Sequence, residues 1–150
     1  MRTRVDFCAE VENEMRLQLP SKSVNESMAR AAVAAFCAQL NPTAVELADI
    51  KCAVSEAVTN AIVHGYRDAC GEITLIMKIG EDRIFCAEVR DKGCGIADID
   101  EAMRPLFTTD PEGERGGMGF SIMESFTDDL TVRSFIGKGT TVIMEKKFRE

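Results

Sequence analysis

VSEAVTNAIVHGY, residues 54–66, decides the fold, because it ends a long predicted helix that has one apolar and one polar side. Thr43 and Glu46 form a capping-box pattern that opens this helix, and Gly65 is placed to end it after His64. A helix turns by about 100° per residue, so apolar residues three or four apart form one core-facing stripe. The stripe consists of Leu47, Ile50, Val54, Val58 and Ala61.

Two polar residues of this stretch, Glu56 and Asn60, are four positions apart and stack on the side away from the stripe. One interpretation is a solvated helix face with a hydrogen bond between the two side chains. The other is chemical, since a carboxylate can act as a general base and an amide oxygen can ligate Mg²⁺. The helix alone leaves both interpretations open.

Strand and helix patterns continue on both sides of this helix. Residues 15–19 alternate as a strand that Pro20 ends. Ser23 with Glu26 predicts a second capping box and a helix to about residue 40. The remaining expected elements are strands at 73–79, 84–90, 130–135 and 140–146 and short helices at about 99–103 and 119–126. We expect an α+β two-layer sandwich, with a five-stranded, mostly antiparallel sheet and the helices on one face.

Length and charge limit the classes of protein. We expect residues 1–14, which are polar and lack periodicity, to be a flexible N-terminal extension, and residues 15–148 to be a single domain. The net charge of −7 argues against a nucleic-acid surface. The longest apolar run, residues 31–38, is too short to span a membrane, and no signal peptide is visible, so the expected location is the cytoplasm.

The cysteine pattern disfavours a zinc site. The six cysteines are scattered without a C-x-x-C pair, and His64 is the only histidine. Cys37 and Cys52 fall in helical patterns and Cys86 in a strand pattern, which suits reduced, partly buried thiols.

DKGCG, residues 91–95, directly follows a predicted strand. It could be a simple turn, because aspartate and glycine are common turn residues. Alternatively, Asp91 accepts a hydrogen bond from an exocyclic amine, while Gly93 and Gly95 let the backbone approach a flat ring closely.

RGGMG, residues 115–119, runs into a predicted helix. One interpretation is a flexible loop with a helix start. The other is a phosphate site, because backbone N–H groups at a helix start attract anions and Arg115 adds a cation. No Gly-Lys-Ser/Thr follows, so the motif is not a Walker loop.

In this order and spacing the motifs resemble the GHKL, or Bergerat-fold, ATP-binding superfamily. Residues 56–60 resemble its N box, and residues 91–95 and 117–119 resemble its two glycine boxes. Within it, residues 13–148 resemble the anti-sigma-F family of serine kinases, whereas residues 1–12 depart from that family. The strings that carry this resemblance are NESMAR (25–30), VSEAVTNAIVHGY (54–66), PLFTT (105–109), GMGF (117–120) and KGTT (138–141).

The resemblance implies a Bergerat ATP-binding fold with ATP and Mg²⁺ as cofactors. It implies that Asn60 holds Mg²⁺ and that Asp91 binds the adenine amine, supported by Thr140 directly or through water. Gly93 and Gly95 would let the base approach closely. The resemblance also implies residues that contact the phosphates. They lie in an ATP lid over residues 105–118 and at the helix start after it. These residues are Thr108, Thr109, Arg115, Gly117 and Gly119.

For function, the resemblance implies a serine kinase that is also an anti-sigma factor. Glu56 would orient or deprotonate the attacking serine hydroxyl. Arg30 matches a position that contacts partner proteins in the family, although it could equally be a surface cation. The implied partners are a sigma factor of the sigma-F type and an anti-anti-sigma protein that is phosphorylated on serine. A homodimer is also implied, with no direct contact to nucleic acid or membrane.

Four alternatives stay open at this point. One is a regulator kinase of the sigma-B stress-response type, and another is an ATP-dependent sigma-binding module without catalysis. A sensor histidine kinase module would need a helical hairpin with a phosphoacceptor histidine, whereas His64 ends the N-box helix. A conformational ATPase of the gyrase or chaperone kind would need a transducer domain, which we do not expect after residue 150.

Overall fold

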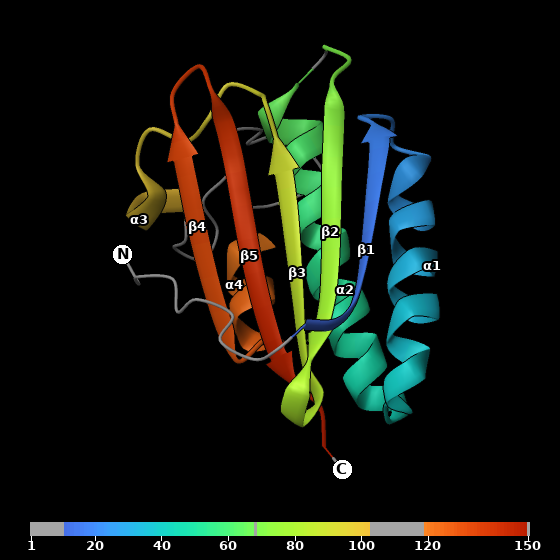
Figure 1. Cartoon of the computed structure of the whole chain (residues 1–150). Coiled ribbons are helices and arrows are strands. Elements are labelled where there is room, and N and C mark those ends of the chain that lie inside the picture. The colour runs from blue at the N-terminus through green and yellow to red at the C-terminus, as the bar shows by residue number, and fades with distance from the viewer. Residues whose placement is uncertain (1–10, 68, 103–118, 150) are drawn as a thin grey trace.

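The computed structural model describes residues 11–67, 69–102 and 119–149 and confirms the predicted two-layer α+β fold (Figure 1). Each neighbouring pair of strands in its five-stranded sheet is antiparallel. The strands are β1 (Val11–Pro20), β2 (Glu72–Gly80), β3 (Ile84–Asp91), β4 (Asp129–Phe135) and β5 (Gly139–Lys147), in the order β1-β2-β3-β5-β4.

In the view of Figure 1, α2 and α4 lie behind the sheet, and α1 stands beside β1 and packs on α2. The described helices are α1 (Asn25–Cys37), α2 (Ala44–Asn60), α3 (Ile99–Ala102) and α4 (Gly119–Ser125). Shorter turns are a 3₁₀ turn at Ala38–Leu40, a π-helical segment at Ala61–Gly65 and a 3₁₀ turn at Glu81–Arg83.

The core lies between α2 and the sheet. Ile50, Val54 and Val58 of the predicted stripe are fully buried, while Leu47 packs at its edge. The facing strands contribute one side of their alternation, including Leu75. Since α2 is held along its whole apolar stripe, its polar side is fixed in orientation as well.

The N-terminus differs from the prediction in two places. β1 begins at Val11 rather than at residue 15, because residues 11–14 pair with β2 although their sequence lacks an apolar alternation. The capping box predicted at Ser23 is wrong, since Val24 is the N-cap of α1 and no side chain caps it. The Glu26 carboxylate instead accepts a hydrogen bond from Ser55 Oγ on α2 at 2.5 Å.

The start of α2 agrees with the prediction. Thr43 Oγ1 accepts from the Glu46 amide at 3.1 Å, and the Glu46 carboxylate accepts from the Thr43 amide at 3.0 Å. The same carboxylate also accepts from the Arg149 amide at 2.7 Å, and these backbone hydrogen bonds hold the pKa of Glu46 below its usual value.

The described cysteines are free thiols, as predicted. Cys37 on α1 is fully buried, and burial raises its pKa to about 12. Cys86 on β3 is also buried. Among the described residues, no helix is long and apolar enough to cross a membrane.

Candidate functional site

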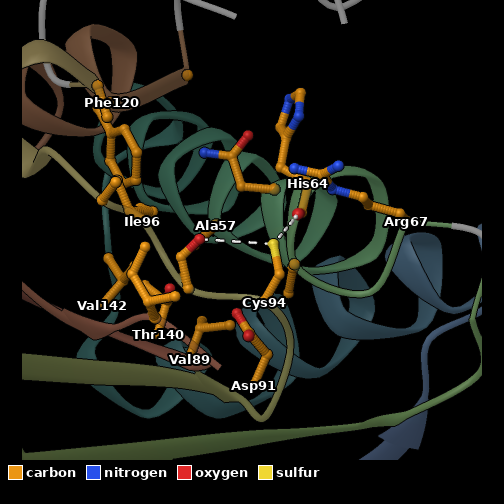
Figure 2. Close-up of a pocket in the computed structure, with 18 of the residues that line it drawn as sticks. Ala57, His64, Arg67, Val89, Asp91, Cys94, Ile96, Phe120, Thr140 and Val142 are labelled. Carbon is orange, nitrogen blue, oxygen red and sulfur yellow. Dashed lines mark hydrogen bonds between the residues drawn. The ribbon is translucent and has the colours of Figure 1, made fainter. Parts of the chain in front are cut away.

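A cavity of about 420 Å³ lies where the end of α2 meets the loop after β3, the start of α4 and strand β5 (Figure 2). The structure brings predicted residues from four separate stretches of sequence to this cavity: Asn60, Asp91, Gly95, Gly119 and Thr140. Its apolar walls come mainly from Ala57, Ala61, Val89, Ile96 and Val142. We call the two sides of this pocket the Asp91 end and the Asn60 end.

At the Asp91 end, a carboxylate lies among apolar neighbours at the end of β3. Asp91 Oδ1 accepts a hydrogen bond from the Gly93 amide at 2.9 Å. Burial raises the pKa of Asp91, and the backbone amides of Gly93 and Thr140 partly offset that increase by stabilising the charged form. A half-buried acceptor of this kind suits an amine donor on a flat, otherwise apolar ligand.

Thr140 lies directly opposite Asp91 across the β3–β5 ladder. Its hydroxyl is 2.7 Å from Ser134 Oγ, and Ser134 Oγ also accepts from the Ile96 amide at 2.7 Å. Ser134 therefore joins the loop after β3 to the strand that carries Thr140. The sequence prediction did not include Ser134, because a serine in a strand has no pattern of its own.

The glycines after Asp91 are required by the protein's own packing. A Cβ at Gly93 would lie 2.2 Å from the Gly65 carbonyl oxygen, and Gly93 is not among the pocket-lining residues. Gly95 has φ +79°, and a Cβ there would lie 2.3 Å from the Phe135 carbonyl oxygen. The predicted reason was room for a ligand, whereas the structure shows close contact between backbones.

The end of the N-box helix is shaped to meet this loop. The π-helical segment ends α2 with a hydrogen bond from the Tyr66 amide to the Ala61 carbonyl at 3.0 Å. The Gly65 carbonyl then accepts from the Cys94 amide at 2.8 Å, and a Cβ at Gly65 would contact the Asp91 carboxyl at 3.0 Å. π-Segments inside helices are common at functional sites, and here the segment joins two predicted motifs.

Tyr66 is a further positioning residue that the sequence prediction missed. Its hydroxyl accepts from the Lys92 amide at 2.7 Å and donates to the Glu72 carbonyl, so it ties the residue after Asp91 to the start of β2. A Cβ at Gly71 would lie 2.1 Å from the Tyr66 ring, so that glycine leaves room for it. The tyrosine stands in the quoted motif, but its positioning role depends on contacts that no local pattern signals.

At the Asn60 end, the Asn60 side chain lies beside the first residue of α4. A Cβ at Gly119 would lie 2.9 Å from Asn60 Nδ2, so glycine is the residue that leaves room for the amide. His64 and Arg67 line the pocket on the same stretch, and Figure 2 shows the Arg67 side chain extending toward His64. Arg67 was not predicted, because it follows the helix outside the quoted motif.

Glu56 and Arg30 lie on a neighbouring surface rather than in the pocket lining. Glu56 is half-buried on α2, one turn before Asn60. Arg30 on α1 forms an ion pair with Glu26 at 3.7 Å. Burial raises the pKa of Cys52, the nearby Glu56 carboxylate raises it further, and Arg30 lowers it. Arg30 lies close to α2, because its ion-pair partner Glu26 accepts a hydrogen bond from Ser55 Oγ of that helix.

The predicted residues of the lid lie outside the described part of the chain. These are Thr108, Thr109, Arg115 and Gly117. Within the described residues, no group of three or more His, Cys, Asp or Glu side chains is arranged to hold a metal ion. A cation at the Asn60 end would therefore take one amide oxygen from these residues and further oxygens from a ligand and water, as Mg²⁺ commonly does.

The fold and the pocket define a class of protein, an ATPase domain related to that of histidine kinases. The family model for the "Histidine kinase-like ATPase domain" matches residues 19–146. ATP is the ligand that such a domain implies. The pocket volume falls within the range typical of small-molecule sites.

Comparison with curated relatives identifies a particular family within this class. The chain is 57% identical over 136 residues to the anti-sigma F factor of Geobacillus thermodenitrificans, covering 91% of this chain and 93% of the relative. It is 54% identical over 138 residues to that of Clostridium acetobutylicum, covering 92% and 96%. The chain belongs to the anti-sigma F factor family.

Solved structures agree on the fold. The RsbU and RsbW domains of a Mycobacterium tuberculosis protein superpose with a TM-score of 0.67 at 20% identity. The match covers 92% of this chain and 33% of that one, so this chain corresponds to about a third of that protein. A histidine kinase domain from Erythrobacter litoralis gives a TM-score of 0.52 at 25% identity, over 69% of this chain and 45% of that one.

Proposed function

We propose that this protein is a cytoplasmic, homodimeric anti-sigma factor that inhibits a sporulation sigma factor of the sigma-F type. In this proposal it also uses Mg·ATP to phosphorylate a serine of its anti-anti-sigma antagonist. The observation that carries the proposal is the single pocket that gathers residues of four separate stretches beside the α2 face bearing Glu56. The relatives' shared name supports the anti-sigma role.

The Asp91 end binds the adenine in this proposal. Asp91 accepts a hydrogen bond from the exocyclic amine, and the Thr140 amide helps to keep that carboxylate charged. Val89 and Val142 lie on neighbouring strands and pack against the ring. Support comes from the burial of Asp91, because an acceptor in an apolar wall favours a ligand that brings its own donor.

The Asn60 end binds the phosphates and the cation. Asn60 offers its amide oxygen to Mg²⁺, and Gly119 leaves the space that this side chain needs. Thr108, Thr109, Arg115 and Gly117 act here as well, as residues of the lid. ATP supplies the phosphoryl group, and the bound cation neutralises charge on its oxygens.

The partner proteins contact α1 and α2 around Arg30 and Glu56. Arg30 binds the partner, and Glu56 orients the serine hydroxyl or takes its proton. Glu56 is one helical turn from Asn60, so a serine held near Arg30 could reach the phosphate side of the pocket along α2. Support comes from the shared influence of Arg30 and Glu56 on the Cys52 thiol.

Transfer of label from [γ-³²P]ATP to the cognate anti-anti-sigma protein tests this function. We expect Glu56→Gln to keep Mg·ATP and sigma binding and to lower phosphotransfer at least about tenfold, because a general base contributes roughly 10²–10⁴-fold. Glu81→Gln, an exposed change in the β2–β3 turn, is the matched control and should transfer phosphate normally.

Three results would count against parts of this proposal. Unchanged transfer by Glu56→Gln removes Glu56 from the mechanism. If the folded wild-type protein binds ATP and sigma but transfers no label to serine, the result supports the alternative of a non-catalytic sigma-binding module. Capture of a sigma factor of the stress-response type in place of the sporulation type, in pull-downs with ATP and with ADP, favours the sigma-B alternative.

A further inference from the structure

Polar side chains form a row across three strands at the Asp91 end of the pocket. Asp91 of β3 is paired with Thr140 of β5, and Thr140 is paired with Ser134 of β4. Residues directly opposite each other on neighbouring strands point to the same face of a sheet. Figure 2 shows the Asp91 and Thr140 side chains on one wall of the pocket, so Ser134 continues that row on the pocket side of the sheet.

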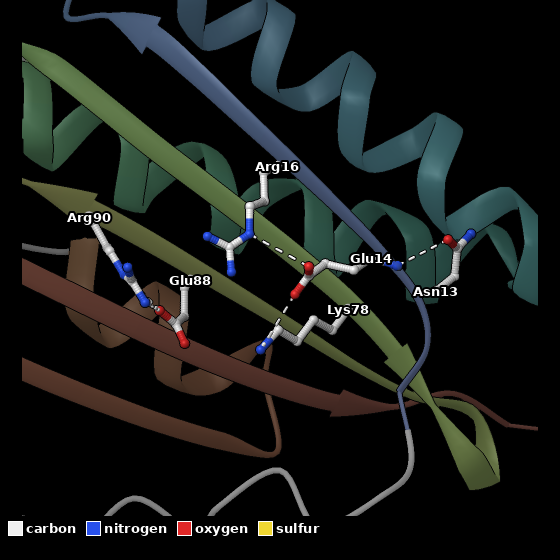
Figure 3. A network of polar contacts seen from close by, with 6 residues as sticks. All are labelled: Asn13, Glu14, Arg16, Lys78, Glu88 and Arg90. Carbon is white, nitrogen blue, oxygen red and sulfur yellow. Dashed lines mark hydrogen bonds and ion pairs between the residues drawn. The ribbon is translucent and has the colours of Figure 1, made fainter.

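The alternation along β3 separates this row from the charged side chains of the sheet. Val89 and Asp91 line the pocket. Glu88 and Arg90 alternate with them and point to the opposite face, where Arg90 Nη2 lies 2.7 Å from Glu88 Oε2 (Figure 3). The hydrogen bonding of the row is therefore decided by its own members, by their backbone neighbours and by whatever the pocket holds.

The structure assigns nearly all the hydrogen bonds of Ser134. Its Oγ accepts from the Ile96 amide at 2.7 Å and lies 3.1 Å from the Gly139 carbonyl oxygen, which can only accept. The same Oγ is 2.7 Å from Thr140 Oγ1, and either hydroxyl can be the donor in that contact. A serine hydroxyl has a single proton, so Ser134 donates either to Gly139 or to Thr140.

These two choices give Thr140 opposite hydrogen-bonding characters. If Ser134 donates to the Gly139 carbonyl, Thr140 donates to Ser134 and presents only an acceptor to the pocket. If Ser134 donates to Thr140, the Thr140 proton is available to a ligand, directly or through one water. The second arrangement exchanges the 3.1 Å hydrogen bond to Gly139 for one to the ligand, so the two arrangements differ little in free energy.

The surroundings of Thr140 make its partner important. Thr140 is only 8% exposed, and the pocket wall beside it is formed by Val89 and Val142. A buried hydroxyl whose proton has no acceptor is costly in free energy. Ser134 supplies that acceptor whenever the ligand does not.

We propose that Ser134 is a positioning residue that lets Thr140 act as either a donor or an acceptor toward the base. This inference rests on the proposed function, in which the adenine of ATP lies at the Asp91 end. Asp91 selects the exocyclic amine, whereas the Thr140 hydroxyl adapts to a nitrogen, an N–H or a C–H at the neighbouring ring position. The substrate class is then nucleotides whose base carries this amine, with adenine as one member.

The test compares ATP with 1-deaza-ATP, whose base has a C–H in place of the ring nitrogen beside the amine. Calorimetry with Mg²⁺ gives the ratio of the dissociation constant for 1-deaza-ATP to that for ATP. In the wild type this ratio should stay below about tenfold, because Thr140 turns its proton to Ser134 when the ring nitrogen is missing. In Ser134→Ala the proton has no acceptor in the 1-deaza-ATP complex, so the ratio should rise at least about fivefold above the wild-type value.

Matched variants separate this role from a structural one. Thr140→Val lacks the hydroxyl and gives the reference ratio, which should be the smallest of the series. Loss of the Ile96 contact in Ser134→Ala could loosen the loop after β3, but that would weaken both nucleotides equally and leave the ratio unchanged. Ser134→Thr keeps a hydroxyl at this half-buried strand position and should restore the wild-type ratio.

A second substitution covers the case in which Ser134→Ala does not fold. Ser134→Cys keeps the approximate size of the side chain, and its thiol is only a weak acceptor, so it should also raise the ratio. Urea unfolding of each variant shows which one to use.

The possible failures are distinguishable. If the wild type binds ATP but Ser134→Ala has the same ratio as the wild type, or a smaller one, the adaptable hydroxyl is refuted and the proposed function stands. If the folded wild type binds neither nucleotide, the proposed function fails and this inference fails with it.

Discussion

The two ends of the pocket are built differently. At the Asp91 end, backbone contacts fix the geometry, since the Cys94 amide donates to the Gly65 carbonyl at 2.8 Å and the Gly93 amide donates to Asp91 at 2.9 Å. At the Asn60 end, the polar groups are side chains from the end of the helix and the turn after it, and Gly119 leaves space beside Asn60.

This difference separates binding from chemistry. Groups that are held by backbone contacts are in position before a ligand arrives. Binding there therefore loses little conformational entropy. Side chains on a helix surface can change partners while the helix itself stays folded. We therefore expect substitutions at the Asp91 end to alter nucleotide affinity and stability together, and substitutions at the Asn60 end to alter function alone.

The largest effect on affinity is expected for Asp91→Asn. The change keeps the shape but removes the charged acceptor, and a hydrogen bond to a charged group contributes about 1.5–3 kcal/mol. ATP affinity measured by calorimetry should fall roughly 10- to 100-fold. Asp98→Asn, at another carboxylate that lines the pocket, is the matched control and should change affinity little. A similar loss for both variants would contradict the assigned role of Asp91.

The dependence on pH sharpens the same prediction. Burial raises the pKa of Asp91, so acid should protonate this carboxylate at a higher pH than it would an exposed aspartate. As the pH is lowered, adenosine affinity should therefore begin to fall at that higher pH. Asp91→Asn should not show this dependence. The contribution of Asp91 to folding stability has the opposite dependence on pH. The folded state holds this proton more tightly than the unfolded state, so the contribution of Asp91 to the free energy of unfolding increases as pH falls through its folded pKa.

A second prediction concerns Gly93. A Cβ at this position meets backbone atoms that cannot rotate away, so Gly93→Ala should lower the free energy of unfolding by about 1–3 kcal/mol and weaken ATP binding as well. Gly137→Asn is the control, because nothing lies within 4 Å of a Cβ there and asparagine tolerates its positive φ. Urea unfolding and calorimetry would measure both quantities. Stability retained with affinity lost would show that Gly93 matters only to the ligand.

The sequence predicted the elements of the fold because their patterns are local. The stripe on α2 needs only the helical period. The capping box at Thr43 forms because the Arg149 amide takes only the second oxygen of the Glu46 carboxylate and leaves the first on the Thr43 amide. The identical signature at Ser23 failed because Glu26 meets Ser55 of another helix and Arg30 of its own. A partner from a distant part of the chain is invisible to a local pattern, and here it overrides the cap.

The same argument applies to the pocket. Asn60, Asp91 and Thr140 could be predicted because their motifs follow one another in a recognisable order. The residues that position them could not, since Tyr66 and Ser134 act through contacts between segments far apart in the sequence. The packing of Gly93 on Gly65 was likewise hidden, because it depends on how the helix end meets the loop after β3.

The smallest expected effect lies at Arg67, which the structure added to the Asn60 end. An exposed cation beside a phosphate contributes about 0.2–1 kcal/mol, so Arg67→Ala should weaken ATP binding roughly two- to fivefold and leave adenosine binding unchanged. Arg67→Lys should keep most of the effect, and added salt should reduce the difference between wild type and Arg67→Ala. If adenosine binding fell as much as ATP binding, Arg67 would belong with the groups that hold the base, and the division of the pocket into two ends would need to be redrawn.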